Sequence, residues 1–355
     1  MDAAANQLIS TLSSAGQAPV QQVQPDGSRL LLLPYGARVL GLFAPASDEN
    51  FFWVHPALAS TASAESFFQS RGWHNTGGDR TWLAPEVDVF FPNYPDTTIW
   101  QVPQELDPGS YQAMEAGPAW KLASDITVKL SRRAEQVQTR ITRHWSPAPN
   151  PLRYEPLGNE LDGITYAGYT QETCLELLAG SAEVAQIGLW NILSVPNGGE
   201  VIVPTYSRAK PEIYSGTIDA ADLTVSGHDV RFRSGGAGIR KIGVRACAST
   251  GRLGYLYQSR DAWALITRNF TVNPSGEYID VPWQRSTAPD AMGYSTQACS
   301  VQTGDWDYCE LEHHLPAISL ASGSTRSVDT SQIWAFRGPP KAIEEVAQCL
   351  LGGER

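Results

Sequence analysis

The residues DYCELEHHLP, at positions 307–316, carry the clearest structural pattern in the chain. Successive side chains of a β-strand point to opposite faces of its sheet, so Glu310 and Glu312 share one face while Cys309 and Leu311 share the other. Two residues along a strand place the two carboxylates roughly 7 Å apart. This separation suits a carboxyl pair that divides acid and base duties on a sugar. A solvated acidic strand face would show the same pattern, so both interpretations stay open at this point.

Titratable groups and aromatic rings gather around this stretch. Carboxylates bind sugar hydroxyls and flat rings stack on sugar C–H faces, so their density favours a carbohydrate-binding cleft. Asp305, Asp307, Glu310 and His314 could also ligate a metal ion, but their spacing matches no diagnostic metal motif. We therefore predict neither a metal nor a cofactor. The residues that gather here are Asp305, Trp306, Asp307, Tyr308, Glu310, Glu312, His313 and His314.

The composition excludes some partners and favours a β-rich fold. The 355 residues include 26 Lys and Arg against 37 Asp and Glu, which gives a net charge of -11. Nucleic-acid and polybasic membrane surfaces need clustered cations, so we predict neither partner. The 11 Trp, 13 Tyr, 31 Gly and 24 Pro supply rings and turn formers, which are typical of strands joined by many loops.

Cysteine usage and the N-terminal residues bear on the compartment. The five cysteines are scattered and form no CxxC pair, so we predict no structural zinc site and no disulfide framework. The N-terminus has no basic segment followed by a long apolar one, and no stretch reaches the length of a transmembrane helix. We expect a soluble protein that is cytoplasmic by default, and a secreted mature form stays open.

The chain shows no linker, composition shift or fixed-period repeat, so we predict one all-β domain over residues 1–355. Short strands recur throughout, beginning with two that flank an Asp26-Gly27 turn. Apolar periodicity and capping residues predict short helices near residues 3–15, 60–71 and 340–351. Ser60 is the expected N-cap of the middle helix.

Two isolated basic residues are further candidates. His144 ends a long alternating strand, where it is either a functional group or a histidine on the rim of a sheet. Lys241 lies within a strand that follows a glycine-rich turn, residues 234–238. There it either contacts an anion or belongs to a solvated basic turn.

Several segments together resemble the galactose mutarotase-like superfamily. Residues 75–86, NTGGDRTWLAPE, resemble the GG-x-R-x-W-x-A-P-E segment of uncharacterised members. Residues 188–196 and 240–244 look like further segments of that group, and residues 309–323 resemble the late strand and following turn of aldose 1-epimerases. This resemblance spans about residues 75–336. It implies a large antiparallel β-supersandwich with a concave carbohydrate-binding face, to which the residue pattern adds short terminal helices.

The resemblance also implies roles for individual residues. Glu312 matches the late-strand Glu that acts as general base in mutarotases, and Glu310 is the alternative counterpart if the strand register differs by two. The middle-strand His of those enzymes has no match, since this chain has Leu189-Trp190 there. The acid would then be another group, and the candidates are His144, His313 and Lys241. The expected substrate-binding residues are Arg80, Trp82, Glu86, Trp190, Asp280, His313 and His314.

The sequence therefore predicts a carbohydrate-active protein that uses general acid–base chemistry in a concave β-sheet cleft. Its simplest form is an aldose epimerase. Glycoside cleavage would add a second carboxylate, Glu86 or Asp280. Elimination at a uronic acid would use Arg80 or Lys241 to neutralise the substrate carboxylate, with His144 or a Tyr as base. The alternative is a non-catalytic carbohydrate-binding or accessory module.

Overall fold

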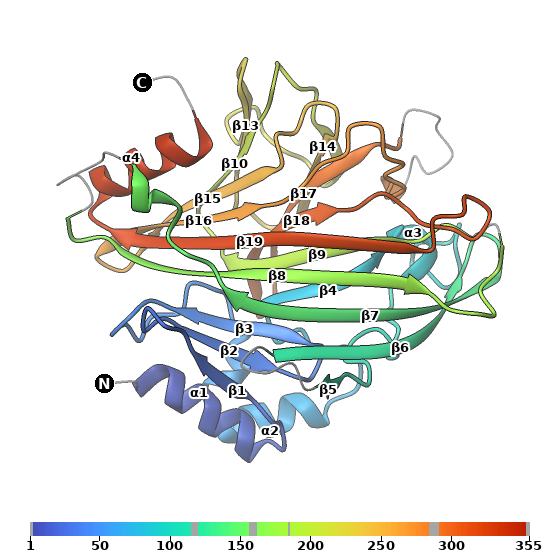
Figure 1. The fold of residues 1–355 in the computed structure, drawn as a ribbon, viewed down its shortest axis with the longest axis horizontal. Helices are drawn as coiled ribbons and strands as arrows, with labels where there is room; N and C mark the ends of the chain where they lie inside the picture. The colour runs from blue at the N-terminus through green and yellow to red at the C-terminus, as the bar shows by residue number, and fades with distance from the viewer. Residues whose placement is uncertain (1–2, 115–119, 156–161, 184, 284–290, 353–355) are drawn as a thin grey trace.

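Two large antiparallel β-sheets stack face to face in the computed structural model, which describes residues 3–114, 120–155, 162–183, 185–283 and 291–352. The nine-stranded sheet has the order β1-β2-β3-β4-β9-β18-β17-β14-β11, and the ten-stranded sheet has the order β12-β13-β10-β15-β16-β19-β8-β7-β6-β5. Figure 1 views the molecule with the ten-stranded sheet in front. This architecture confirms the predicted all-β sandwich.

Strands far apart in sequence lie side by side in both sheets. The nine-stranded sheet contains β1 (Val20–Val23), β2 (Arg29–Leu33), β3 (Arg38–Phe43), β4 (Asp79–Ala84), β9 (Gly188–Pro196), β18 (Trp306–His314), β17 (Tyr294–Thr303), β14 (Gly238–Arg245) and β11 (Glu212–Ser215). The ten-stranded sheet contains β12 (Leu223–Val225), β13 (Asp229–Arg233), β10 (Glu200–Pro204), β15 (Arg252–Ser259), β16 (Ala262–Asn269), β19 (Arg326–Gly338), β8 (Thr165–Leu177), β7 (Glu135–Pro147), β6 (Trp120–Leu130) and β5 (Gln112–Met114).

Short helices lie at the margins of the sandwich. The side chain of Ser60 accepts a hydrogen bond from the backbone N–H of Ser63, which caps the middle helix. Gly352 ends the last helix with a positive φ of 71°, a conformation that glycine adopts without strain. Within the described residues, no helix is long and apolar enough to cross a bilayer. The helices are α1 (Ala3–Ser14), α2 (Thr61–Gln69), α3 (Glu86–Val89) and α4 (Pro340–Leu351), with 3-10 turns η1 (Pro56–Ala59) and η2 (Pro151–Tyr154).

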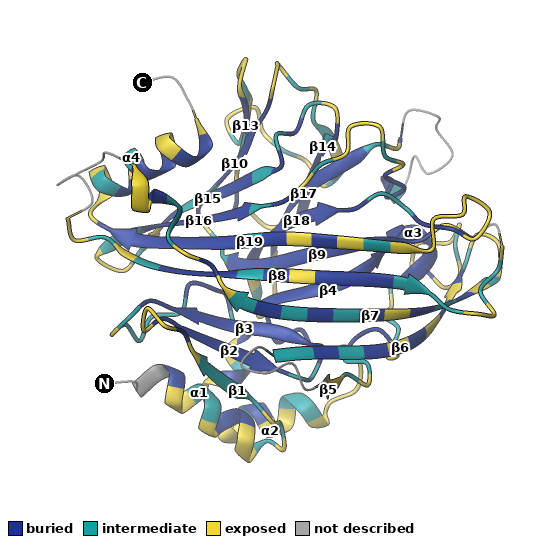
Figure 2. Ribbon diagram, viewed as in Figure 1, coloured by how far each residue is buried: buried dark blue, intermediate teal, exposed yellow. Residues whose placement is uncertain are grey.

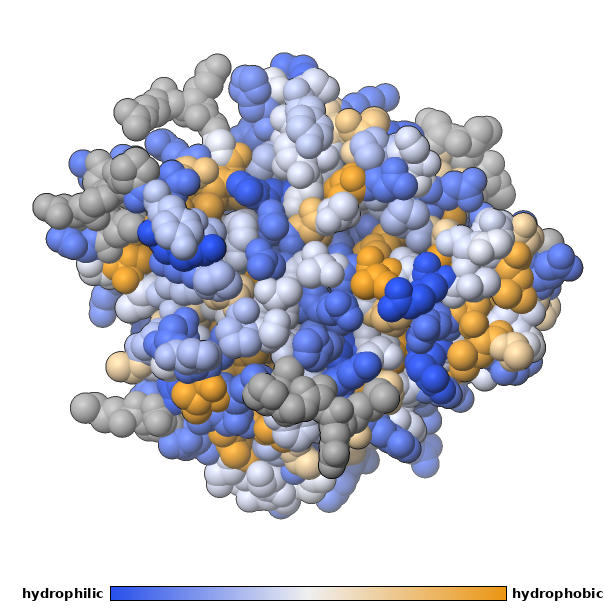
Figure 3. Space-filling view, viewed as in Figure 1, coloured by the Kyte–Doolittle hydropathy of each residue, from blue (hydrophilic) through white to orange (hydrophobic). Residues whose placement is uncertain are grey.

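The two sheets differ in how they meet solvent. Strands β6 and β7 alternate buried and more exposed residues, as expected for a sheet with one wet face. Strands β4 and β9 are buried along almost their whole length on both faces. Figure 2 shows this contrast, and Figure 3 shows a mainly hydrophilic surface over the ten-stranded sheet. The outer face of the nine-stranded sheet is therefore covered by other parts of the chain at β4 and β9.

The space between the sheets holds the largest hydrophobic cluster. Leu193 and Leu311 from the nine-stranded sheet share this cluster with Tyr169 and Ile333 from the ten-stranded sheet. Apolar area removed from water stabilises the fold by roughly 25 cal/mol per Å². This burial fixes which face of each strand points inward, because a shift of one residue would turn every side chain over.

A buried ionic cluster ties the sheets together at the centre of this core. Asp79 of β4 accepts bonds from Arg143 of β7 at 3.0 Å and from Arg268 of β16 at 3.1 Å. The hydroxyl of Tyr169 donates to the same carboxylate at 2.8 Å. The side chains of all three charged residues are 0% exposed. One carboxylate thus pairs with two guanidinium groups in a region of low dielectric constant.

We expect Asp79→Asn to lower the free energy of unfolding by about 3–5 kcal/mol, because two buried cations lose their counter-charge. Urea denaturation followed by circular dichroism measures this change. The matched control is Asp125→Asn, which breaks an exposed pair with Arg140 and should leave stability nearly unchanged. Equal effects of the two substitutions would contradict the structural role of Asp79.

Candidate functional site

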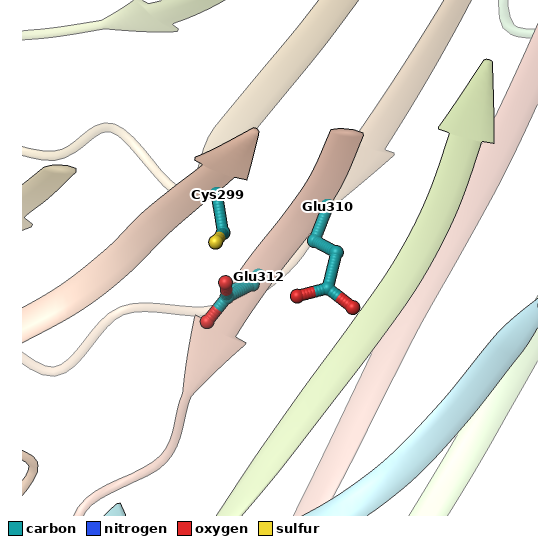
Figure 4. Close-up of side chains that lie close together, drawn as sticks. All are labelled: Cys299, Glu310 and Glu312. Atoms are coloured by element: carbon teal, nitrogen blue, oxygen red, sulfur yellow. The ribbon is translucent and has the colours of Figure 1, made fainter. Parts of the chain in front are cut away.

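The late strand β18 presents its even-numbered residues to the outer face of the nine-stranded sheet. Glu310 lies between Ser194 of β9 and Cys299 of β17 as Cα partners, and Cys299 in turn lies opposite Lys241 of β14. Glu310 and Glu312 share a face, as the sequence alternation predicted. Figure 4 shows the two carboxylates beside Cys299 on the neighbouring strand. Side chains from five adjacent strands, β4 to β14 in sheet order, therefore meet at one place.

A cavity of about 300 Å³ lies over this face. Its charged walls are Arg80, Glu86, Lys241 and Glu310, and most of its other walls are aromatic. Such a volume and lining fall within the range of small-molecule sites. The complete lining is Trp73, Arg80, Trp82, Glu86, Phe91, Thr97, Trp100, Trp190, Tyr214, Ser215, Ile239, Lys241, Trp283, Cys299, Val301, Trp306, Tyr308 and Glu310.

Arg80 and Glu310 form the first ion pair of the cavity. The Arg80 Nη2 and Glu310 Oε1 atoms are 2.6 Å apart, and Arg80 Nη1 donates to the Ser194 hydroxyl at 3.2 Å. The guanidinium lies 4.2 Å from the ring centroid of Trp82 and 5.5 Å from that of Trp73. A planar cation stacked on rings keeps a fixed orientation, so Glu310 is held at the cavity wall.

Lys241 forms the second set of ionic contacts. Its Nζ lies 3.0 Å from Glu312 Oε2 and 3.8 Å from Glu86 Oε2, and 4.4 Å above the ring of Trp190. The indole N–H of Trp190 donates to Glu312 at 2.7 Å. Glu312 is completely buried and lies beneath the cavity wall rather than on it. Within the described part of the chain, its second oxygen, Oε1, has no hydrogen-bond partner.

Glu86 opens the short helix α3 directly after β4. Its two oxygens accept hydrogen bonds from the indoles of Trp100 at 3.1 Å and Trp283 at 3.0 Å. Its backbone N–H donates to Asp280 at 2.8 Å, and Asp280 also accepts a bond from Gln297 at 2.8 Å. Asp280, expected to bind substrate, is instead buried behind the wall. Both of its oxygens are used, and it positions Glu86.

The electrostatic environment shifts the pKa values of the buried groups. Burial raises the pKa of Glu312 to about 7, although Lys241 partly opposes the shift. Burial also raises the pKa of Glu86. Burial alone would lower the pKa of Lys241, but Glu312 and Glu86 reverse that effect and raise it above its ordinary value. Lys241 is therefore a fixed cation, while two carboxyl groups near it hold protons more tightly than usual.

The three candidate histidines do not enter the cavity. His314 stacks on Trp190 with ring centroids 5.4 Å apart, and burial lowers its pKa to about 3. His313 points to the opposite face of β18, where it contacts Asp329 of the ten-stranded sheet at 2.9 Å. His144 lies on β7 of that same sheet. Strand alternation separates His313 from Glu312, and sheet membership separates His144 from all the other candidates.

Several cavity residues were not among the sequence candidates. Trp100 and Trp283 lie in irregular segments, where no periodicity indicates the direction of a side chain. Tyr214 lies on the short edge strand β11, and the sequence gives no sign that this strand borders β14. Cys299 could have been found, because pairing β17 with β18 as a hairpin places it opposite Glu310.

The side chains of Cys299, Glu310 and Glu312 approach one another closely enough to hold a cation. One ligand atom from each residue lies within 4.8 Å of the other two (Figure 4). Arg80 and Lys241 already balance the two carboxylates, so a metal ion would have to displace them. The arrangement therefore fits hydrogen bonding and proton transfer better than metal ligation.

We expect the elevated pKa of Glu312 to make stability depend on pH. The folded protein holds this proton more tightly than the unfolded chain, whose pKa stays near 4.5. The resulting stabilisation is fully present below pH 4.5 and is lost as the pH rises through about 7. Relative to Glu312→Gln, the wild type should lose about 3 kcal/mol of unfolding free energy over this range.

Urea denaturation across that pH range tests the expectation, with Glu172→Gln on the exposed face of β8 as the matched control. The control should follow the wild type. A difference between wild type and Glu312→Gln that stays constant with pH would mean that Glu312 titrates at its ordinary value.

Comparisons with known proteins agree with this fold. A protein from Escherichia coli K12 assigned as an aldose 1-epimerase superposes with a TM-score of 0.53 at 8% identity, covering 90% of this chain and 99% of that chain. A galactose mutarotase related enzyme from Lactobacillus acidophilus gives a TM-score of 0.51 at 8% identity, covering 91% and 98%. No curated protein sequence matches the chain. The chain has a galactose mutarotase-like fold and, because it matches the family model over residues 8–354, belongs to the family of unknown function DUF6786.

Proposed function

We propose that this protein binds a sugar or glycoside in the cavity over the nine-stranded sheet and acts on it by general acid–base chemistry. One observation carries the proposal. Two carboxylates, Glu86 and Glu310, and two cations, Arg80 and Lys241, line a cavity of about 300 Å³ whose other walls are mostly aromatic. Charged groups can bind sugar hydroxyls there while the rings stack on sugar C–H faces. The aldose epimerase-like fold agrees with such a ligand.

Within this proposal Glu310 is the base. It lies on the cavity wall, whereas Glu312 is completely buried beneath it. A base must come within hydrogen-bond reach of the proton that it removes, and only a group on the wall can approach a bound sugar. Arg80 fixes Glu310 Oε1 by an ion pair of 2.6 Å. The register alternative, in which Glu310 replaces Glu312 as the late-strand base, therefore has the better geometric support.

Lys241 is the proposed electrophile, because its raised pKa keeps it a cation. Glu312 and the face of Trp190 hold its ammonium group in place, and the group lines the cavity. A fixed cation on the cavity wall stabilises negative charge that develops on a ring or leaving oxygen. Glu312 then acts as a positioning residue, because it orients Lys241 without reaching the ligand.

A non-catalytic binding module is the second candidate, and two features favour it. Each carboxylate already contacts a cation, with Arg80–Glu310 at 2.6 Å and Lys241–Glu312 at 3.0 Å. Residues 189–190 also supply Leu and Trp where mutarotases carry a histidine. Such compensated charges can hold a glycan without transferring a proton. Turnover separates the two candidates, since a binder has saturable affinity and forms no product.

We expect Glu310→Gln and Lys241→Met to reduce turnover by about 10²–10⁴-fold each, the usual contribution of a positioned base or of a fixed charge at the reacting centre. Proton NMR of free aldoses, uronic acids and glycosides measures this loss. The assay reports anomeric exchange, new reducing ends or new vinylic signals. Glu172→Gln on the exposed face of β8 is the matched control and should keep wild-type rates.

Near-ultraviolet circular dichroism checks that each variant stays folded. Wild-type turnover that survives in folded Glu310→Gln would overturn the assignment of the base. Saturable binding with no product from any sugar would instead establish the binding module. If none of these sugars binds or reacts, the proposed function fails.

A further inference from the structure

A second and larger cavity adjoins the first one. It has a volume of about 850 Å³, against about 300 Å³ for the cavity that holds Glu310. We call these the outer and inner cavities. Three tryptophans, Trp73, Trp100 and Trp306, line both of them. The outer cavity is also lined by Tyr35, Arg71, His74, Gln104 and Asp107.

The shared tryptophans form an ordered partition between the two cavities. Trp73 packs edge-to-face against Trp100 and Trp306, with ring centroids 5.7 Å and 5.8 Å apart. The Trp73 indole donates to Asp107 of the outer cavity at 2.9 Å, and the Trp100 indole donates to Glu86 of the inner cavity at 3.1 Å. The partition is thus anchored on both sides. All three rings keep part of their surface accessible, which sugars use for stacking.

The reactive groups of the inner cavity lie next to this partition. The Arg80 guanidinium is 5.5 Å from the centroid of Trp73 and pairs with Glu310 at 2.6 Å. A sugar unit bound over Glu310 therefore has the partition beside it. Any group attached to that unit on the same side would point past the partition toward the outer cavity.

The outer cavity suits an uncharged, hydroxyl-rich group. Asp107 is already paired with Arg38 at 2.6 Å, and His74 hydrogen-bonds to Tyr35 at 2.7 Å. Exposed residues at its edge, including Arg71 and Gln104, connect it to solvent. A chain of sugar units could enter there, because the opening is polar and the buried charges are compensated.

From this geometry we infer that the substrate is an uncharged oligosaccharide rather than a free monosaccharide. Its terminal unit occupies the inner cavity and its next unit occupies the outer cavity, across the partition of Trp73, Trp100 and Trp306. The inference rests on the proposed function, because it assigns the substrate class of the same site. The outer cavity then binds the second sugar unit of the same ligand.

Affinity as a function of chain length tests this inference. Isothermal titration calorimetry compares glucose, galactose and mannose with their β-1,4-linked disaccharides and trisaccharides. We expect the disaccharide of at least one sugar to bind about tenfold more tightly than its monosaccharide, a difference of ~1.4 kcal/mol. In the double variant Arg71→Ala/Gln104→Ala, this advantage of the longer ligand should shrink.

The matched control is Arg153→Ala/Gln348→Ala, which removes the same exposed residue types outside both cavities. It should preserve the full advantage of the longer ligand. A disaccharide advantage that the outer-cavity variant leaves intact would overturn the inference, as would equal affinities for all chain lengths. If monosaccharides then still react and Glu310→Gln abolishes the reaction, the proposed function stands alone. If no saccharide binds or reacts, the proposed function fails as well.

Discussion

The carboxylate of Asp79 is the point on which the sandwich depends. It pairs with both Arg143 and Arg268 from the ten-stranded sheet, and each of these three side chains is fully buried. Removing water from three charges is costly, and their mutual attraction offsets that cost only while their geometry holds, so the cluster fixes β4 against the opposite sheet. The next residue, Arg80, must then point to the outer face, because neighbouring strand residues alternate. The same constraint that closes the core therefore delivers Arg80 to Glu310.

Strand β18 repeats this division between its two faces. His313 contacts Asp329 in the interior, while Glu310 and Glu312 lie on the outer face beneath the covering loops. A strand buried on both faces cannot shift by one residue without exchanging its ionic and apolar partners. Register is thus specified twice, once by the core and once by the site. This explains how side chains from five strands meet with ion-pair distances near 3 Å.

Local patterns predicted the parts of the site that depend on one strand. Alternation placed Glu310 and Glu312 on a common face, and the GGDRTWLAPE segment supplied Arg80, Trp82 and Glu86. The depth of Glu312 could not be predicted, because it depends on the indole of Trp190 and on Lys241 from strands distant in sequence. The placement of His144 away from the other candidates could not be predicted either, because strand order across a sheet is a long-range property. The indoles that hold Glu86 lie in loops, which carry no periodic signal.

The ion pairs of the inner cavity are poorly explained as stabilising features. Buried pairs seldom stabilise a fold more than well-packed apolar residues of similar volume would, because each charge loses its hydration. The lining and the residue beneath it also leave contacts incomplete. Lys241 lies 3.8 Å from Glu86, which is longer than a hydrogen bond, and Glu312 Oε1 is buried without a partner among the described residues. A hydroxyl group both accepts and donates, so one sugar hydroxyl can accept from Lys241 while it donates to Glu86. The charged groups neutralise one another but do not use all of their hydrogen-bonding capacity on one another. A site for a polyhydroxylated ligand requires this combination.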